Sequence, residues 1–310
     1  MKIMDVEAFI AKYLAYCEHQ KQLSGKTLKA YRIDLKQYLA FAVERENPLG
    51  RIVLLDYIAH LHASFQPKTA KRKIACLKAF CAWLEYEELL VANPFQKIQT
   101  KFREPFRLPR TIPVEQIQSL LNAVYRAHKD SVSSYQRMTL SRDAAVLELL
   151  FATGVRVSEL CSLRPENVNL TEGVIKIYGK GAKERLIQIG NPDVLTALRT
   201  YRNTFDGKIQ QQGWFFINRL GNCLSEQSVR DIICKHASAC GLTLHITPHM
   251  FRHSFATLLL EEDVDIRYIQ KMLGHSSIAT TQIYTHVSAR KQKDILTTKH
   301  PRNRLAVNPR

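Results

Sequence analysis

The chain has 310 residues, with 45 lysines and arginines against 28 aspartates and glutamates, and a formal net charge of +17. Its length is typical of two domains, and a 45% share of hydrophobic residues provides each with a core, which excludes a disordered or fibrous chain. No run of about 18 apolar residues occurs, so we expect neither a membrane span nor a signal peptide. The seven cysteines form no Cys-x-x-Cys pair and are interpreted as buried thiols. These features predict a soluble protein of a reducing compartment, the cytoplasm.

Positive charge is spread over the whole chain. Residues 1–110 hold 19 basic and 11 acidic residues, and the remainder holds 26 and 17. A polyanion that contacts both parts explains this distribution, and DNA or RNA fits better than a membrane because no polybasic block or basic amphipathic anchor is present. Charge alone also fits a merely basic soluble protein.

Residues 1–95 carry apolar side chains at helical spacing almost throughout, and strand-like alternation is absent. Two long helices separated at Ser24-Gly25, a short one at 54–61 and a fourth at 67–85 predict a four-helix domain. The fourth helix carries basic residues opposite its apolar stripe, where a helix would face phosphates. These basic residues are Lys68, Lys71, Arg72, Lys73 and Lys78. For each of them, the alternative is an ordinary charged side chain that faces solvent. We take Lys71, Arg72 and Lys73 as candidates for DNA binding.

Residues 96–113 are expected to form a basic linker between the domains. Helical periodicity fails there, and prolines stand at 94, 105, 109 and 113. Proline stiffens such a segment, so it can span a duplex while its positive charge holds it near the phosphates. Its candidate DNA-binding residues are Lys101, Arg103 and Arg107.

Residues 114–310 are predicted to form a second, mainly α domain with a small antiparallel β-sheet. A helix is expected from Val114 to about His128, then a polar stretch to about Ser141, then an apolar helix over 144–152 that stops at Gly154. Period-two alternation over 174–178 and 184–189, on either side of a glycine-rich turn, predicts a β-hairpin. After Ser225 the pattern is helical again.

Two cationic side chains in this domain are candidates for phosphate chemistry. Arg156 follows the Gly154 helix stop, and its planar fork can donate two parallel hydrogen bonds to a phosphate. Lys180 lies in the hairpin turn between two glycines, where a mobile ammonium can donate a proton. An exposed salt-bridging arginine and an ordinary turn lysine are the alternatives, and Lys183 and Arg185 compete with Lys180 for its role. Lys183 is also a candidate for DNA binding.

The segment 247–253 predicts a helix N-terminus that faces an anion. Thr247 and Pro248 are start signals, and His249 and Arg252, three residues apart, share one helix face beside the unpaired N–H groups of the first turn. His253 stands four residues after His249, as in some zinc sites, but Met250 and Phe251 replace the glutamate base, so no metal is expected. Further along, His275 opens a new segment and Tyr284 is the candidate nucleophile, chosen among twelve tyrosines for its polar surroundings.

The order Arg, Lys, His-x-x-Arg, His, Tyr resembles that of the tyrosine recombinase (phage-integrase-like) family, most of all the Xer-type site-specific recombinases. The resemblance covers nearly the whole chain and is strongest in ATGVRVSEL (152–160), GKGAKERL (179–186), PHMFRHSFATLL (248–259) and LGHSSIATTQIYTHV (273–287). It implies a helical core-binding domain at 1–95 and a catalytic domain at 114–310 with a C-terminal exchange tail. The longer polar segment before Arg142 and the residues after Arg302 depart from the Xer pattern. They leave open a chromosome-dimer resolvase or a mobile-element integrase.

The resemblance also implies a mechanism without cofactors. Tyr284 attacks a phosphodiester and forms a 3′-phosphotyrosyl link, Arg156, Arg252 and His275 stabilise the phosphate charge, Lys180 protonates the leaving 5′-oxygen, and His249 handles the tyrosine proton. Glu159 is expected to orient Arg156. The implied partners are a double-stranded DNA site and three further protomers, in a homotetramer or a heterotetramer with a second recombinase. A type IB topoisomerase and a non-catalytic DNA-binding relative are the alternative functions.

Overall fold

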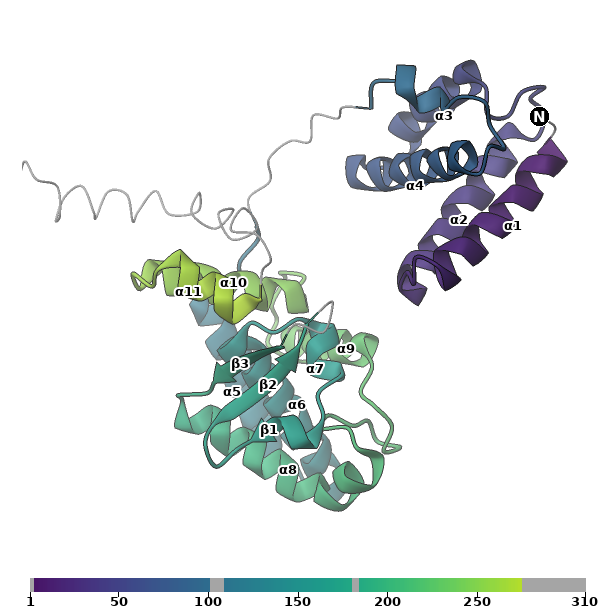
Figure 1. Ribbon diagram of the computed structural model, residues 1–310. Coiled ribbons are helices and arrows are strands. Elements are labelled where there is room, and N and C mark those ends of the chain that lie inside the picture. The colour runs from purple at the N-terminus through teal and green to yellow at the C-terminus, as the bar shows by residue number, and fades with distance from the viewer. Residues whose placement is uncertain (1–2, 101–108, 180–183, 275–310) are drawn as a thin grey trace, which may run out of the picture. The chain divides into compact units, whose positions relative to one another are not determined.

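The computed structural model describes residues 3–100, 109–179 and 184–274. The chain divides into two compact units, Met1–Phe106 and Arg107–Arg310, and the division falls inside the predicted linker. Figure 1 shows that the first unit is built of helices and that the second combines helices with one small sheet. No described helix has both the length and the hydropathy needed to cross a bilayer.

The first unit is the expected four-helix domain. Its helices are α1 (Ile3–His19), α2 (Gly25–Ala42), α3 (Arg51–Ser64) and α4 (Pro67–Tyr86). Ser24 caps α2 by accepting a hydrogen bond from the Thr27 N–H, which explains why the break at 24–25 separates two helices. The apolar stripes of the helices meet in one core. There the centroid of the Tyr13 ring lies 5.4 Å from the ring centroids of Phe80 and Trp83.

This unit extends beyond the predicted boundary at residue 95. Residues Pro94–Lys97 form the short 3-10 helix η1, and Phe95 and Ile98 are buried in the core of the first unit. The core of the first unit therefore includes Ile98, three positions past the predicted boundary. Near the other end of the predicted linker, Ile112 is buried in the core of the second unit. Burial of Ile98 in one core and of Ile112 in the other anchors the two ends of this segment.

The second unit packs most of its helices and its sheet around one large core. Strands β1 (Val168–Asn169), β2 (Val174–Tyr178) and β3 (Glu184–Gln188) form an antiparallel sheet in the order β1-β2-β3, with Ile175 paired to Ile187 in the predicted hairpin. The short 3-10 helix η2 (Pro165–Asn167) precedes β1. The helices are α5 (Val114–Lys129), α6 (Ser134–Thr153), α7 (Val157–Cys161), α8 (Pro192–Gln212), α9 (Glu226–Ala239), α10 (Pro248–Glu261) and α11 (Ile266–Leu273). A smaller cluster of Ala256, Ile269 and Leu273 joins α10 to α11.

Helix α6 is longer than the apolar segment predicts. It begins at Ser134, where Ser133 accepts a hydrogen bond from the Gln136 N–H, so much of the polar stretch before Ser141, for which no helix was predicted, is helical. Its first turns are exposed and carry few apolar residues, which removes the periodic signal there. From Leu140 onward the helix is buried among α5, α8 and α10.

Helix α8 has no counterpart in the sequence prediction, although its signals are present. Asn191 accepts hydrogen bonds from the N–H groups of Asp193 and Val194, Pro192 occupies the first turn, and Gly213 ends the helix in the left-handed conformation. Its buried face recurs every three or four residues: Val194, Ala197, Leu198, Tyr201, Phe205 and Ile209.

The cysteines are free thiols, and most of them follow the prediction of burial. Four are buried and Cys223 and Cys240 are half-buried, but Cys234 on α9 is exposed, so the prediction is wrong there. Its side chain lies outside the buried stripe of α9.

Candidate active site

Arg156 stands in the sharp turn between α6 and α7. Gly154 ends α6 with φ = 58°, and an added Cβ there would lie 2.7 Å from the Phe255 ring, so the turn requires glycine for both conformation and space. Two residues later, Arg156 is the N-cap of α7 with extended backbone. Its side chain is 38% exposed, which leaves it accessible to a ligand.

The buried carboxylate of Glu159 fixes this arginine. Its Oε2 accepts the Arg156 backbone N–H at 2.9 Å, and its Oε1 accepts Nη1 of the same residue at 2.8 Å. The expected contact between Glu159 and Arg156 is therefore confirmed. Burial alone would raise the pKa of Glu159, but hydrogen bonds from Arg185 and Arg156 outweigh burial and lower that pKa, so the carboxylate is ionised at neutral pH.

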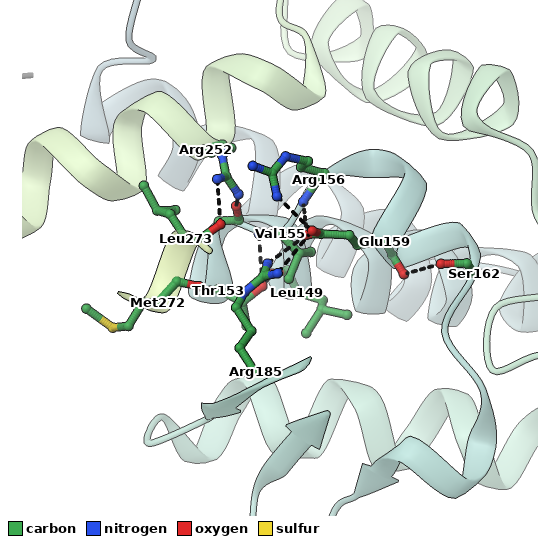
Figure 2. Close-up of polar contacts among 11 residues, drawn as sticks. Leu149, Thr153, Val155, Arg156, Glu159, Ser162, Arg185, Arg252, Met272 and Leu273 are labelled. Atoms are coloured by element: carbon green, nitrogen blue, oxygen red, sulfur yellow. Dashed lines mark hydrogen bonds and ion pairs between the residues drawn. The ribbon is translucent and has the colours of Figure 1, made fainter. Parts of the chain in front are cut away.

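Arg252 reaches the same turn from α10. Thr247 and Pro248 start this helix as predicted, and Arg252 lies in its second turn, only 1% exposed. Its Nη1 donates to the Gly154 carbonyl at 2.7 Å, and its Nη2 donates to the Leu273 carbonyl at 2.6 Å. The two predicted arginines are thus brought to one turn, and Arg252 also links that turn to the end of α11 (Figure 2).

The two histidines of α10 contact each other. His249 is exposed in the first turn, and its ring centroid lies 4.7 Å from that of the half-buried His253, edge to face. Burial, and then the charges of His249 and Arg252, lower the pKa of His253 to about 4, so His253 is neutral at pH 7. No group of three metal-ligating side chains occurs in residues 3–100, 109–179 and 184–274.

Several predicted residues lie outside the described part of the chain: Lys101, Arg103, Arg107, Lys180, Lys183, His275 and Tyr284. Lys180 and His275 directly follow described residues. In the sequence, Lys180 lies between β2 and β3, and His275 follows Gly274, which ends α11 with φ = 64°. The roles of these residues remain predictions.

The three basic candidates of α4 differ in their surroundings. Lys71 and Arg72 are exposed, although Arg72 also contacts Asp34 of α2. Lys73 is only 3% exposed, and its Nζ donates to Asp34 Oδ1 at 3.0 Å and also to Gln37. The prediction that Lys73 lies on an exposed DNA-facing surface is therefore wrong, because a buried ammonium needs the carboxylate that Asp34 supplies.

Arg185 contributes to the site in a way that the sequence did not indicate. It was considered only as an alternative to Lys180, yet it bonds to Glu159, 26 positions before it, and to the Met272 carbonyl, 87 positions after it. No spacing rule connects residues so far apart. Because the Arg185 guanidinium already donates hydrogen bonds to Glu159 and to the Met272 carbonyl, Arg185 does not replace Lys180 as the candidate proton donor.

Comparison with known proteins identifies the family. The Phage integrase family matches residues 110–291, and the phage integrase N-terminal SAM-like domain matches residues 10–88. A tyrosine recombinase of Agathobacter rectalis is 52% identical over 299 residues, covering 96% of this chain and 98% of its own length. The tyrosine recombinase XerD of Staphylococcus saprophyticus is 34% identical, covering 96% of this chain and all of its own length.

A solved structure shares the fold. The XerH site-specific recombinase, crystallised with its palindromic difH substrate after cleavage, aligns with a TM-score of 0.75 at 20% identity and covers 91% of this chain and 82% of its own. The matched families and the curated relatives do not favour a topoisomerase or a non-catalytic relative. The chain belongs to the phage integrase family and is a site-specific tyrosine recombinase that acts on DNA.

Proposed function

We propose that Tyr284 is the nucleophile of this recombinase and that Arg156 and Arg252 bind the scissile phosphate. The convergence of the two arginines on the turn at 154–156 is the observation that supports this assignment most directly. Arginine keeps its charge at every working pH and holds the growing negative charge of the phosphate without a metal ion. His275 donates a further hydrogen bond to the phosphate.

Each step exchanges one phosphodiester for another. The Tyr284 oxygen forms a bond to phosphorus while the bond to the 5′-oxygen breaks, and Lys180 gives that oxygen a proton. His249 accepts the tyrosine proton. The freed 5′-hydroxyl of one strand then attacks the phosphotyrosine of the partner strand, which releases Tyr284 and rejoins the DNA. Because the number of phosphodiester bonds is conserved, no external energy source is needed.

The Tyr284→Phe variant tests the nucleophile because it removes only the attacking oxygen. We expect unchanged DNA binding and no covalent adduct resistant to SDS on a nicked substrate that traps the cleaved state. The Tyr268→Phe variant, which alters an exposed tyrosine of α11, is the control and should form the adduct at the parent's rate. An adduct formed by Tyr284→Phe would assign the nucleophile to a different tyrosine.

Both domains are proposed to clamp one duplex through the linker. The first unit offers exposed Lys71 and Arg72, and the linker and second unit add further basic residues. Residues 1–98 and 109–310, expressed separately, should each bind a half-site more weakly and with a smaller salt dependence than the whole chain, because log K changes by about 0.9 per phosphate neutralised per log unit of salt. A second-unit fragment with the parent's affinity and salt slope would contradict the clamp.

The working assembly is proposed to be a tetramer on two DNA sites, either of four identical chains or with a second recombinase. An apolar groove of about 660 Å³ lies among α5, α6 and α8 and includes Ile117, Leu121 and Phe151, with the carboxylates of Glu148 and Asp193 in its lining. Such a groove suits a basic segment with a few apolar residues, and the tail around Ile295 and Leu296 has that composition.

Removing the tail tests the tetramer. A chain ending at Lys291 should bind a single half-site normally but lose synapsis and recombination of two full sites. Leu121→Lys, which places a positive charge in the groove against the basic tail, should cause the same separation in a full-length chain. Recombination at the parent's rate by the truncated chain would exclude the tail as the element that couples protomers.

A further inference from the structure

Arg185 donates three hydrogen bonds within the site. Its Nη1 and Nη2 donate to the two carboxylate oxygens of Glu159 at 3.0 and 2.7 Å, and its Nε donates to the Met272 carbonyl at 2.8 Å. The side chain is 9% exposed. Figure 2 shows it between Glu159 and the end of α11. One rigid guanidinium therefore joins β3, α7 and α11.

The burial of Arg185 separates its role from that of Arg156. Glu159 bonds to both arginines, but Arg156 keeps 38% of its side chain exposed whereas Arg185 directs its hydrogen bonds inward. Arg156 is exposed enough to contact a phosphate, whereas all three guanidinium nitrogens of Arg185 already donate to a carboxylate or a carbonyl, so Arg185 holds these neighbours in place. Arg185 can therefore affect the reaction only indirectly, through the residues that it holds.

Gly274 provides independent support for a built contact. A Cβ at this position would lie 2.9 Å from Nη1 of Arg185 and 3.2 Å from its Cδ. The glycine that ends α11 thus leaves space for the arginine, at the residue that precedes His275. The end of α11 and the guanidinium of Arg185 therefore pack closely against each other. Displacement of the guanidinium would remove this packing and the hydrogen bond to the Met272 carbonyl.

We propose that Arg185 is a positioning residue for strand cleavage: through Glu159 it fixes the phosphate-binding Arg156, and through the Met272 carbonyl it fixes the end of α11 that leads to His275. This inference rests on the proposed role of Arg156. It adds a residue that never touches the DNA but determines whether the groups that do so are aligned. Lysine cannot replace it, because an ammonium lacks the planar set of donors that reaches a carboxylate and a carbonyl together.

The test compares two DNA substrates. One has a normal scissile phosphate, and the other has a methyl group in place of a non-bridging oxygen, which removes the charge that Arg156 stabilises. At saturating protein, Arg185→Gln should cleave the normal substrate about 100-fold more slowly than the parent, as expected for misplaced catalytic groups. On the neutral substrate its loss should be at least about tenfold smaller, because less charge needs stabilisation there. Half-site affinity should stay within about twofold of the parent's, since Arg185 lies away from the surface.

Controls separate the possible failures. Arg199→Gln also removes an arginine that donates to a backbone carbonyl, that of Leu170, but lies away from Glu159, and it should match the parent on both substrates. If Arg185→Gln does not fold, Arg185→Lys carries the same comparison. Equal losses on both substrates would overturn the positioning role and indicate general destabilisation. If Arg156→Ala itself shows no difference between the substrates, the proposed role of Arg156 fails instead.

Acting through Glu159 also predicts non-additive effects. Glu159→Gln and Arg185→Gln should slow cleavage of the normal substrate to similar extents, and the double variant should be no slower than the slower single variant. Multiplied losses in the double variant would show that the two residues act separately and would contradict the proposal.

Discussion

The Nη1 atom of Arg252 donates a 2.7 Å hydrogen bond to the carbonyl of Gly154, which links the second turn of α10 to the end of α6. The bond depends on a left-handed residue that turns the chain toward Arg156. Arg252, which is expected to bind phosphate, therefore also holds the backbone next to Arg156. A substitution at Gly154 can test stability and catalysis together.

Replacing Gly154 by alanine should be costly. Positive φ strains any residue with a Cβ, and here the Cβ would also lie 2.7 Å from the Phe255 ring, so we expect Gly154→Ala to lose about 1–3 kcal/mol of stability and to slow DNA cleavage. Gly207→Ala is the matched control. It lies within α8 with no atom near its Cβ position and should gain about 0.4–1 kcal/mol. Midpoints of urea unfolding measure both, and a lower midpoint for Gly207→Ala than for Gly154→Ala would contradict this reading.

The two neighbouring lysines of α4 should behave differently. Lys73→Met removes a buried partner of Asp34 and should destabilise the protein by about 1–3 kcal/mol, with an unchanged salt slope of DNA binding in the folded state. Lys71→Met removes an exposed charge, so it should leave stability nearly unchanged and lower the salt slope by about 0.9. Thermal unfolding and half-site binding over a salt series measure the two effects. A reduced slope for Lys73→Met would place its ammonium at the DNA surface.

Stability should fall as the pH falls from about 6.5 to about 4, in part because of His253. Its folded-state pKa of about 4 lies below the ordinary 6.5, so in this window the unfolded chain takes up a proton that the folded chain refuses. This uptake favours unfolding by at most about 1.4 kcal/mol per pH unit. His253→Gln should make the unfolding midpoint less dependent on pH, whereas His245→Gln, at an exposed histidine, should not. Identical pH profiles for the parent and His253→Gln would refute the burial of a neutral imidazole.

Lys180→Ala should preserve DNA binding and slow cleavage by about 10²–10⁴-fold, because the 5′-oxygen leaves poorly without a proton. A substrate with sulfur in place of the bridging 5′-oxygen should restore the rate, since sulfur leaves without protonation. Lys183→Ala is the control and should cleave both substrates at the parent's rate. If the sulfur substrate rescues Lys183→Ala instead, the proton donor is Lys183.

The sequence predicted those features that repeat along it or that form a local signal. Apolar spacing gave the helices of the first unit, alternation gave the hairpin, and Thr247-Pro248 gave the start of α10, because each depends on residues within one element. It failed where an exposed helical turn has no apolar face, as at Ser134. Helix α8 has local start and stop signals at Asn191-Pro192 and Gly213, although no helix was predicted there.

Burial and long-range pairing were beyond the sequence for a different reason. Lys73 and Lys71 are the same residue type on the same helix, and the buried one is distinguished by its partners Asp34 and Gln37, 39 and 36 positions before it. Likewise, Glu159 was recognisable as a partner for Arg156 three positions away, but its second partner comes from another strand. Such contacts depend on how the elements pack, which no spacing within an element encodes.

Helix α11 ends with Met272 and Leu273, whose carbonyls accept hydrogen bonds from Arg185 and Arg252. The C-terminal end of a helix carries a partial negative charge of about half an electron, because its last carbonyls have no partners within the helix. Left open, that end would repel a DNA phosphate held by Arg156. Because each of these two carbonyls accepts a hydrogen bond from a guanidinium, the positive charges of Arg185 and Arg252 offset the partial negative charge at the end of α11. The end of this helix can therefore lie near an anion-binding site without repelling the anion.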